Sequence, residues 1–216
     1  MFTGIITAVG TLESLTAPEA DLRRLRILAP YDAEGIALGA SIACGGPCLT
    51  VVDRGSQPQG GCWFEVDAAA ETLARTSLGQ WQVGQRINLE RALAIGDELG
   101  GHLVTGHVDG VTKILRRTAI TGQSGPWAAS VRFDIEAPSA LARFIAEKGS
   151  ITLDGTSLTV NSVTDNSVTG NQFSVLLIPH TLQVTTWGER QEGDVLNIEI
   201  DLMARYAARL VEAAAH

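Results

Sequence analysis

Apolar and polar residues alternate along most of this chain, in short runs separated by turn-forming residues. In the run 22–30, Leu25 stands between two arginines and Ile27 follows two positions later. A period of two places successive side chains on opposite faces of a strand, so such runs predict strands with one buried face. We therefore expect strands at 22–30, 62–68, 85–92, 129–137 and 194–201.

Segments rich in Gly, Pro, Asp and Asn predict turns at 53–61, 121–126 and 164–167. Short strands at regular intervals, without long βαβ units, are typical of an antiparallel sandwich or barrel. A closed barrel leaves no exposed sheet edge, which suits a small domain. The pattern therefore predicts an all-β fold and favours a barrel.

The chain also repeats itself. Segments 71–90 and 180–199, which are 109 residues apart, share eight of twenty positions, and segments 41–52 and 150–161 share six of twelve. Average composition would give only about one or two identities in twenty positions. A weaker match relates 2–12 to 104–114, at an offset of 102. Three matches in the same order predict two homologous domains, at 1–97 and 98–200, followed by a tail at 201–216.

Short helices are expected at two equivalent places in each copy. The first pair is 32–38 with 137–149, where Pro138, Ser139 and Gly149 supply start and stop signals. The second pair is 70–78 with 179–187.

The tail predicts a longer helix, over 202–214. Its apolar residues fall on one face, and they are Met203, Tyr206, Ala207, Leu210 and Val211. Sixteen residues outside both copies cannot form a core of their own. The apolar face must therefore dock, either on a barrel or on a neighbouring subunit.

Composition narrows the function class. The chain has 216 residues, a formal charge of −8 and a 45% hydrophobic content, so it has enough apolar residues for a core and lacks the basic footprint of a nucleic-acid binder. Three cysteines are too few for a disulfide scaffold. No apolar run approaches the ~18–20 residues that span a membrane, and the N-terminus does not read as a secretory signal. We expect a soluble, cytoplasmic protein with no membrane or nucleic-acid partner.

Common nucleotide-binding, metalloprotease and hydrolase motifs do not occur in the sequence. Cys44 and Cys48 lack a second close pair of ligands, and His102 and His107 would lie on opposite faces of a straight strand. The spacing therefore does not predict a zinc site.

Six segments carry a more specific signal: MFTGII at 1–6, CLTV at 48–51, ETL at 71–73, GGHLVTGHVDG at 100–110, GTSLTV at 155–160 and LIPHTL at 177–182. In this order, and with the duplication, they closely resemble the riboflavin synthase family of tandem lumazine-binding domains. The resemblance covers essentially the whole chain.

The resemblance implies two tandem six-stranded Greek-key β-barrels with short helices and a C-terminal helix that assembles a homotrimer. It implies a dismutation in which two molecules of 6,7-dimethyl-8-ribityllumazine exchange a four-carbon unit, giving riboflavin and 5-amino-6-ribitylamino-uracil without a cofactor or metal. The active site would lie between the N-terminal barrel of one subunit and the C-terminal barrel of another. Two similar pockets suit two identical substrates, because they hold both molecules in position. Whether lumazine synthase associates with the chain is left open.

Three residues are candidates for catalysis. Cys48 is either a nucleophile or a binding group, and His107 either moves a proton or is a hydrogen-bonded strand residue. Ser41 either relays a proton or starts a strand. His102 is interpreted as structural.

The substrate-binding candidates combine the family segments with the repeat. Gly4–Ile6 and Gly106–Val108 would bring backbone close to a flat ring, and the Cys48 and Ser157 clusters would present polar groups to it. The segments 67–72 and 176–181 would hold the ribityl chain, and Lys148 either reaches the pocket of another subunit or is a solvated residue. The full set is Gly4, Ile5, Ile6, Cys48, Leu49, Thr50, Asp67, Ala68, Ala69, Ala70, Glu71, Thr72, Gly106, His107, Val108, Lys148, Ser157, Leu158, Thr159, Leu176, Leu177, Ile178, Pro179, His180 and Thr181.

Two non-catalytic interpretations compete with the enzyme. A lumazine- or flavin-binding protein of the same fold needs only one good pocket, whereas both CLTV and SLTV are present here. A flavin-binding module of a reductase would be followed by a nucleotide-binding α/β domain. The retained cysteine and the two histidines of the 100–110 segment favour the enzyme.

Overall fold

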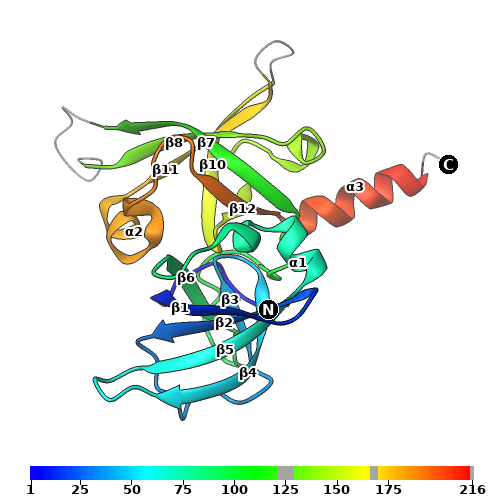
Figure 1. Cartoon of the computed structure of the whole chain (residues 1–216). Coiled ribbons are helices and arrows are strands. Elements are labelled where there is room, and N and C mark those ends of the chain that lie inside the picture. Colours follow the sequence, from blue (N-terminus) through cyan, green and yellow to red (C-terminus); the bar gives the residue numbers. More distant parts are fainter. Residues whose placement is uncertain (121–128, 166–169, 215–216) are drawn as a thin grey trace.

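Two closed barrels stand one above the other in the computed structural model, which describes residues 1–120, 129–165 and 170–214 (Figure 1). The first barrel contains β1 (Ala8–Glu19), β2 (Leu22–Ala29), β3 (Ser41–Cys44), β4 (Cys48–Ser56), β5 (Cys62–Ala69) and β6 (Arg86–Arg91). They close in the order β1-β2-β5-β4-β3-β6, and all neighbouring strands are antiparallel.

The second barrel repeats this topology. It contains β7 (Gly110–Ala119), β8 (Val131–Glu136), β9 (Ser150–Leu153), β10 (Thr156–Thr164), β11 (Gln172–Leu177) and β12 (Val195–Ile200). The closed order is β10-β11-β8-β7-β12-β9, the same cycle with each strand number raised by six. The duplication and the two six-stranded antiparallel barrels confirm the fold expected from the sequence.

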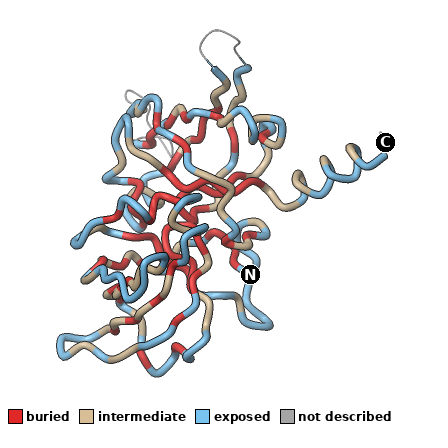
Figure 2. The backbone as a smooth tube through the Cα atoms, turned by 45° about the vertical axis from the view of Figure 1, so that its right-hand side comes forward, coloured by how far each residue is buried: buried red, intermediate tan, exposed pale blue. Residues whose placement is uncertain are grey.

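The alternation of side chains fills each barrel. On β2, Leu25 and Ile27 are fully buried, while Arg24 and Arg26 point outward. In the second barrel Phe133 and Trp187 meet edge to face, with ring centroids 4.9 Å apart. Figure 2 shows buried residues along the strands of both barrels and where the barrels meet.

One of the two predicted helix pairs is confirmed. α1 (Ala70–Arg75) and α2 (Pro179–Val184) lie at equivalent places, and each continues into a 3₁₀ turn, at Ser77–Gln80 and Thr186–Gly188.

The other predicted helix pair, 32–38 with 137–149, is wrong. At 32–38 the Asp32 carboxylate accepts a hydrogen bond from the Glu34 N–H at 3.1 Å, so the backbone folds into consecutive turns. In 137–149 only Ala142–Phe144 forms a 3₁₀ turn, and Ser139 caps no helix. The apolar residues of this segment, among them Phe144 and Ile145, pack on the core of the second barrel around this short turn.

The turn predictions have mixed outcomes. The segment 53–61 is part strand, because β4 continues to Ser56 before the chain turns. The segment 121–126 lies outside the described residues, and so does the second half of 164–167.

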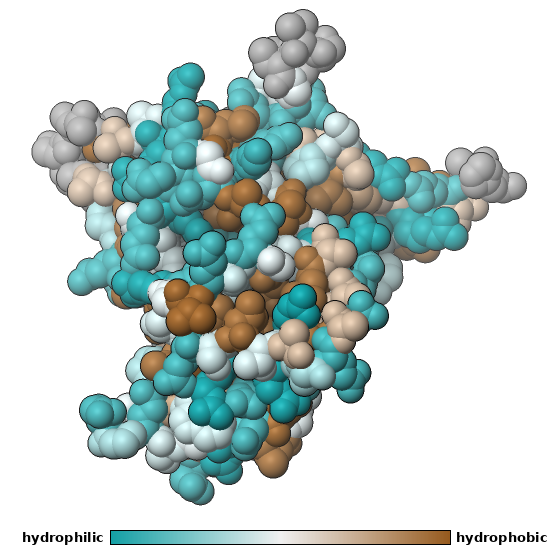
Figure 3. All heavy atoms as spheres, in the orientation of Figure 1, coloured by the Kyte–Doolittle hydropathy of each residue, from teal (hydrophilic) through white to brown (hydrophobic). Residues whose placement is uncertain are grey.

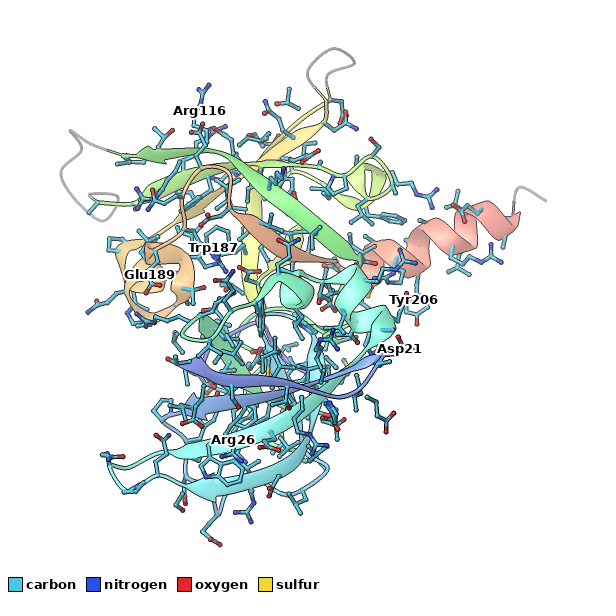
Figure 4. The ribbon with its side chains drawn as sticks, viewed as in Figure 1. Asp21, Arg26, Arg116, Trp187, Glu189 and Tyr206 are labelled. Atoms are coloured by element: carbon cyan, nitrogen blue, oxygen red, sulfur yellow. The ribbon has the colours of Figure 1, made fainter. Side chains whose placement is uncertain are left out.

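α3 (Leu202–Ala214) begins and ends within the predicted tail and projects from the second barrel (Figure 1). Met203 and Leu210 on its apolar face are 72% and 71% exposed. Figure 4 shows Tyr206 projecting from α3 and not into a barrel. The apolar face is therefore not covered by either barrel of this chain. In the part of the chain that the structure describes, no helix is long and apolar enough to cross a membrane.

The two barrels meet through pairs of equivalent contacts. The Asn197 side-chain amide donates to Gly45 O at 2.7 Å and accepts from Ser77 N at 2.7 Å. Its counterpart Asn88 donates to Asp154 O at 3.0 Å and accepts from Thr186 N at 2.8 Å. Each asparagine thus satisfies backbone groups of the opposite barrel. Such reciprocal contacts are typical of a two-fold interface, here formed within one chain.

The segments that lead into the barrels also cross this junction. Phe2 and Val104, at equivalent positions of the leading segments 2–6 and 104–108, exchange two backbone hydrogen bonds of 2.8 and 3.1 Å. Gly4 O accepts from Ser157 N of the second barrel at 2.8 Å, and Gly106 O accepts from Cys48 N of the first at 2.9 Å. Each leading segment therefore lies against β4 or β10 of the other barrel.

Candidate functional site

Two pockets lie at equivalent places of the barrel junction. The larger has a volume of about 460 Å³, within the range of small-molecule sites. It is lined by Pro47, Cys48, Glu71, Thr72, Arg75, Thr76, Gly106, His107, Val108 and Asp109.

The smaller pocket has a volume of about 170 Å³. It is lined by Gly4, Ile5, Ile6, Thr156, Ser157, His180, Thr181, Val184 and Thr185. Every one of these residues is the repeat equivalent of a residue in the larger pocket, at an offset of 109 or 102. Each pocket therefore combines the helix and strand of one barrel with the leading segment of the other. Figure 3 shows apolar residues gathered on the surface where the two barrels meet.

The larger pocket brings two predicted catalytic residues together. Cys48 begins β4 and is half-buried, and the exposed His107 follows Gly106 on the opposite wall. Gly106 has a φ of +73°, and a Cβ on it would lie 2.6 Å from the Cys48 Cβ. Only glycine allows this approach, so Gly106 fixes the wall that carries His107.

A buried glutamate anchors this wall. Glu199 on β12 accepts hydrogen bonds from Thr105 N at 2.8 Å, Thr105 Oγ1 at 2.6 Å and Gly106 N at 3.0 Å. In the first copy Glu90 accepts the same three bonds from Thr3 and Gly4. Burial raises the pKa of Glu90, while these bonds oppose the rise.

The smaller pocket has a different polar group at its base. Ser157 occupies the place of Cys48, and its Oγ lies 2.7 Å from His102 Nδ1. The Nε2 of the same imidazole lies 3.0 Å from Thr152 Oγ1. Burial lowers the pKa of His102, and the nearby Asp201 and Glu199 carboxylates oppose that shift. His102, interpreted from the sequence as structural, thus contacts a pocket hydroxyl directly.

The helices give the two pockets different rims. On α1 the Arg75 guanidinium contacts the Glu71 carboxylate at 2.9 Å, four residues earlier. The equivalent residues of α2 are Val184 and His180. The ETL and HTL segments predicted Thr72 and Thr181 on these helices. They did not predict the pocket residues one turn further on, which are Arg75, Thr76, Val184 and Thr185.

The third catalytic candidate lies beside the larger pocket. Ser41 is the ladder partner of Thr50, and Thr50 lies two residues after Cys48 on β4. Cross-strand partners and residues two apart share a face of a sheet, so these three side chains are on one outer face of the first barrel. This face continues from the wall of the larger pocket.

Several predicted binding residues have side chains elsewhere. Leu49, Ala68 and Leu177 are buried in the barrel cores. The Asp67 carboxylate is held by Arg24 through two 2.8 Å bonds, which lowers the pKa of Asp67. These segments would therefore contact a ligand through their backbone groups. The remaining candidates Ala69, Ala70, Leu158, Thr159, Leu176, Ile178 and Pro179 also do not line the two pockets.

Lys148 is exposed and lies outside both pockets. Its φ of +65° is rare for a residue with a side chain, and its repeat equivalent is Gly39 at +83°. In both copies the N–H at this position donates to the neighbouring strand at 2.8 Å. The tight turn accounts for the backbone conformation of Lys148. The role of its side chain stays a prediction.

Cys48 differs from the other two cysteines, which are fully buried. Burial raises the pKa of Cys44 and of Cys62, so neither thiol readily forms a thiolate. Cys48 is therefore the accessible thiol of the chain. The described residues contain no cluster of three or more His, Cys, Asp or Glu that is arranged to hold a metal ion.

The lumazine binding domain family matches the chain twice, at residues 3–92 and 105–201. A riboflavin synthase from Brucella abortus is 54% identical over 98% of this chain and 98% of its own length. The chain belongs to the riboflavin synthase family. The riboflavin synthases of Mycobacterium bovis and Bacillus subtilis are 44% and 39% identical, over 99% of this chain and 100% and 91% of their own lengths. The family membership expected from the six segments is confirmed.

Solved structures with the same fold include LumP complexed with riboflavin. The TM-score is 0.76, at 22% identity, over 93% of this chain and 99% of that chain. A structure of LumP complexed with 6,7-dimethyl-8-(1'-D-ribityl) lumazine has a TM-score of 0.73, at 21% identity, over 92% of this chain and 98% of that chain. At this identity the likeness concerns the tandem-barrel fold.

Proposed function

We propose that this chain is a riboflavin-forming transferase. Two molecules of 6,7-dimethyl-8-ribityllumazine would exchange a four-carbon unit, giving riboflavin and 5-amino-6-ribitylamino-uracil, with no added cofactor or metal. The observation that carries the proposal is a pair of equivalent pockets with unequal linings. Identical substrates that act as donor and acceptor need similar shapes but different chemistry. The 54% identity to a riboflavin synthase over 98% of the chain supports catalysis over binding alone.

The larger pocket supplies the groups for proton transfer and covalent addition. The 7-methyl group of one lumazine must lose a proton before its carbon can attack, and the His107 imidazole, which lines the larger pocket, is proposed to take it. The Cys48 thiol either adds to C7 of the ring or holds the ring in place. Ser41, on the same outer face, is proposed to relay a proton. Placing both substrates in contact supplies much of the rate enhancement by itself.

The smaller pocket supplies a hydroxyl and not a thiol. The His102 imidazole at 2.7 Å either donates to the Ser157 hydroxyl or accepts its proton, depending on the tautomer. Ser157 would then bind a polar edge of the second lumazine, with Thr181 on the neighbouring helix available to the ribityl hydroxyls.

We infer that the complete active site forms between subunits. The helices that border the two pockets, α1 and α2, lie on opposite sides of the junction in Figure 1, so the pockets of one chain do not face each other. The larger pocket of one subunit would face the smaller pocket of another. The exposed apolar face of α3 supports assembly through this helix, and we propose a homotrimer.

One assay tests the enzyme against its rival. The purified protein is incubated with 6,7-dimethyl-8-ribityllumazine, without added cofactor, and riboflavin is followed by its absorbance. Turnover supports the enzyme. Tight stoichiometric binding without turnover would identify a non-catalytic lumazine- or flavin-binding protein.

A truncation tests the assembly. Deleting residues 203–216 removes most of α3, and we expect monomers by light scattering. A trimer of the truncated chain would contradict the role of the helix. The proposed location is the cytoplasm, where the three free thiols stay reduced, and cell fractionation tests it. Association with lumazine synthase would be tested by co-purification of the two proteins.

A further inference from the structure

The wall of the larger pocket ends in a carboxylate that reaches α3. Asp109 lines the pocket two residues after His107, and its side chain is only 11% exposed. A buried carboxylate is costly unless it is paired. Its Oδ2 accepts from Ile200 N at 2.9 Å, and Arg205 Nη2 contacts Oδ1 at 2.8 Å and Oδ2 at 2.9 Å.

Arg205 belongs to α3 and not to the barrel. It lies in the first turn of the helix, where its N–H donates to Asp201 O at 3.1 Å. The ion pair therefore connects the C-terminal helix to the pocket wall. The other end of this wall is held by Glu199, so His107 lies between two anchors.

The second anchor has no counterpart in the first copy. The residue equivalent to Asp109 is Thr7, whose hydroxyl meets the Tyr31 hydroxyl at 2.6 Å. Gly96 stands at the position equivalent to Arg205. The glutamate anchor occurs in both copies, as Glu90 and as Glu199. The Asp109–Arg205 anchor occurs only on the wall that carries His107.

We propose that Arg205 is a positioning residue for the larger pocket. By pairing with Asp109 it holds the segment 106–109, and with it the distance between His107 and Cys48. Docking of α3 on its own barrel is thereby coupled to the geometry of the pocket. The catalytic consequence rests on the proposed function, but the structural consequence does not.

Reactivity of Cys48 gives a readout that needs no substrate. Cys48 N donates to Gly106 O at 2.9 Å, so a loosened wall uncovers the thiol. Cys44 and Cys62 are buried and will label slowly. In Arg205→Met we expect iodoacetamide to modify Cys48 about fivefold faster or more than in wild type, as expected for more frequent local opening. Arg205→Lys, which keeps a charge, should restore much of the protection.

A matched control comes from the same helix. Arg143 and Glu212 form a 2.5 Å ion pair between α3 and the second barrel, away from the larger pocket. Arg143→Met should leave Cys48 labelling unchanged. Equal labelling of wild type and Arg205→Met, or equal acceleration by Arg143→Met, would overturn the proposal.

Assembly is separated from positioning by a further variant. Met203→Asp disturbs the exposed face of α3 while keeping Arg205. If Arg205→Met changes the oligomeric mass, its Cys48 labelling is compared with that of Met203→Asp. Faster labelling in Arg205→Met supports the proposal, and equal labelling refutes it.

Steady-state kinetics then test the catalytic consequence. In the riboflavin assay Arg205→Met should lower kcat by about tenfold, with a smaller change in KM, because the misplaced wall affects the positioned histidine more than ring binding. If wild type forms no riboflavin, the proposed function fails while the labelling result still decides the anchor. If labelling accelerates but kcat is unchanged, Arg205 fixes the wall without serving catalysis, and the positioning role is refuted.

Discussion

The larger and smaller pockets occupy equivalent places, yet one presents a thiol and the other a hydroxyl. Cys48 stands opposite Ala43 in its ladder, whereas Ser157 stands opposite Thr152 with His102 bridging the two hydroxyls. The rims differ as well, because α1 carries an ion pair where α2 carries a valine and a histidine.

At the barrel junction, in contrast, equivalent residues of the two copies make equivalent contacts. Asn88 and Asn197 make equivalent bonds to the opposite barrel, and Glu90 and Glu199 make equivalent bonds to the two leading segments. These two asparagines and two glutamates are identical between the copies, whereas the pocket pairs Cys48/Ser157, His107/Ile5 and Arg75/Val184 differ. The difference separates the requirements of folding from those of chemistry.

The largest effect should come from His107, whose equivalent in the smaller pocket is Ile5. His107→Ala should lower kcat about 100-fold, or about 2.7 kcal/mol of transition-state stabilisation, because a positioned acid–base group contributes at least this much. Lumazine binding should change little. The control is Ile5→Ala at the equivalent position of the smaller pocket, for which we expect less than about a threefold change in kcat, because it removes only apolar contact. Similar losses in both variants would mean that His107 acts by packing.

Exchanging the Cys48 thiol and the Ser157 hydroxyl tests how the chemistry of the two pockets differs. Cys48→Ser should lower kcat about tenfold or more with a smaller effect on KM, since a hydroxyl is a weaker nucleophile than a thiol near neutral pH. Ser157→Cys should cost less, because the smaller pocket is proposed to bind through its hydroxyl. Stopped-flow binding and steady-state turnover separate the two steps. An unchanged kcat in Cys48→Ser would remove Cys48 from the catalytic residues.

The rim should have a smaller effect. Arg75→Val copies the rim of the smaller pocket, and we expect KM for the lumazine to rise about threefold with kcat nearly unchanged, because only binding contacts are lost. Thermal stability should stay within about 0.5 kcal/mol, since the Glu71–Arg75 pair is exposed. The reciprocal Val184→Arg variant is the control, and a loss of kcat in Arg75→Val would contradict a purely binding role.

The smallest effect concerns pH, and it belongs to the second copy alone. Burial lowers the pKa of His102 in the folded state, so below its usual value of about 6.5 the unfolded chain binds a proton that the folded chain does not. This contribution to stability is present above about pH 6.5 and is lost as the pH falls toward the lowered pKa. His102→Gln should flatten the fall in unfolding free energy, measured by urea denaturation at several pH values. An unchanged slope would show that other groups cause it.

The sequence predicted the architecture well because the repeat and the alternation are local signals. The strands at 22–30 and 194–201 and the helix at 202–214 follow directly from the spacing of apolar residues. The segment at 32–38 failed because a short apolar run is compatible with both a helix and consecutive turns, and Asp32 selects the turn. The domain boundary between residues 97 and 98 stays a prediction.

The exchange of leading segments could not be read from the sequence. The repeat predicts two similar pockets, but not that Gly106 closes against Cys48 of the first barrel and Gly4 against Ser157 of the second. Such contacts depend on how two barrels meet, and a single sequence encodes no local signal for that. The repeated asparagines and glutamates were visible as identities, but their bonds across the junction became clear only in three dimensions.

The crossing of the leading segments has a consequence for the origin of the molecule. A half-length ancestor with one barrel could not have closed a pocket alone, because the closing glycine comes from the other copy. Two chains would have had to meet, at a cost set by their concentration. Fusion made this encounter intramolecular, and from then on it was independent of concentration. It also allowed the two leading segments to change separately, and one now carries His107 where the other carries Ile5.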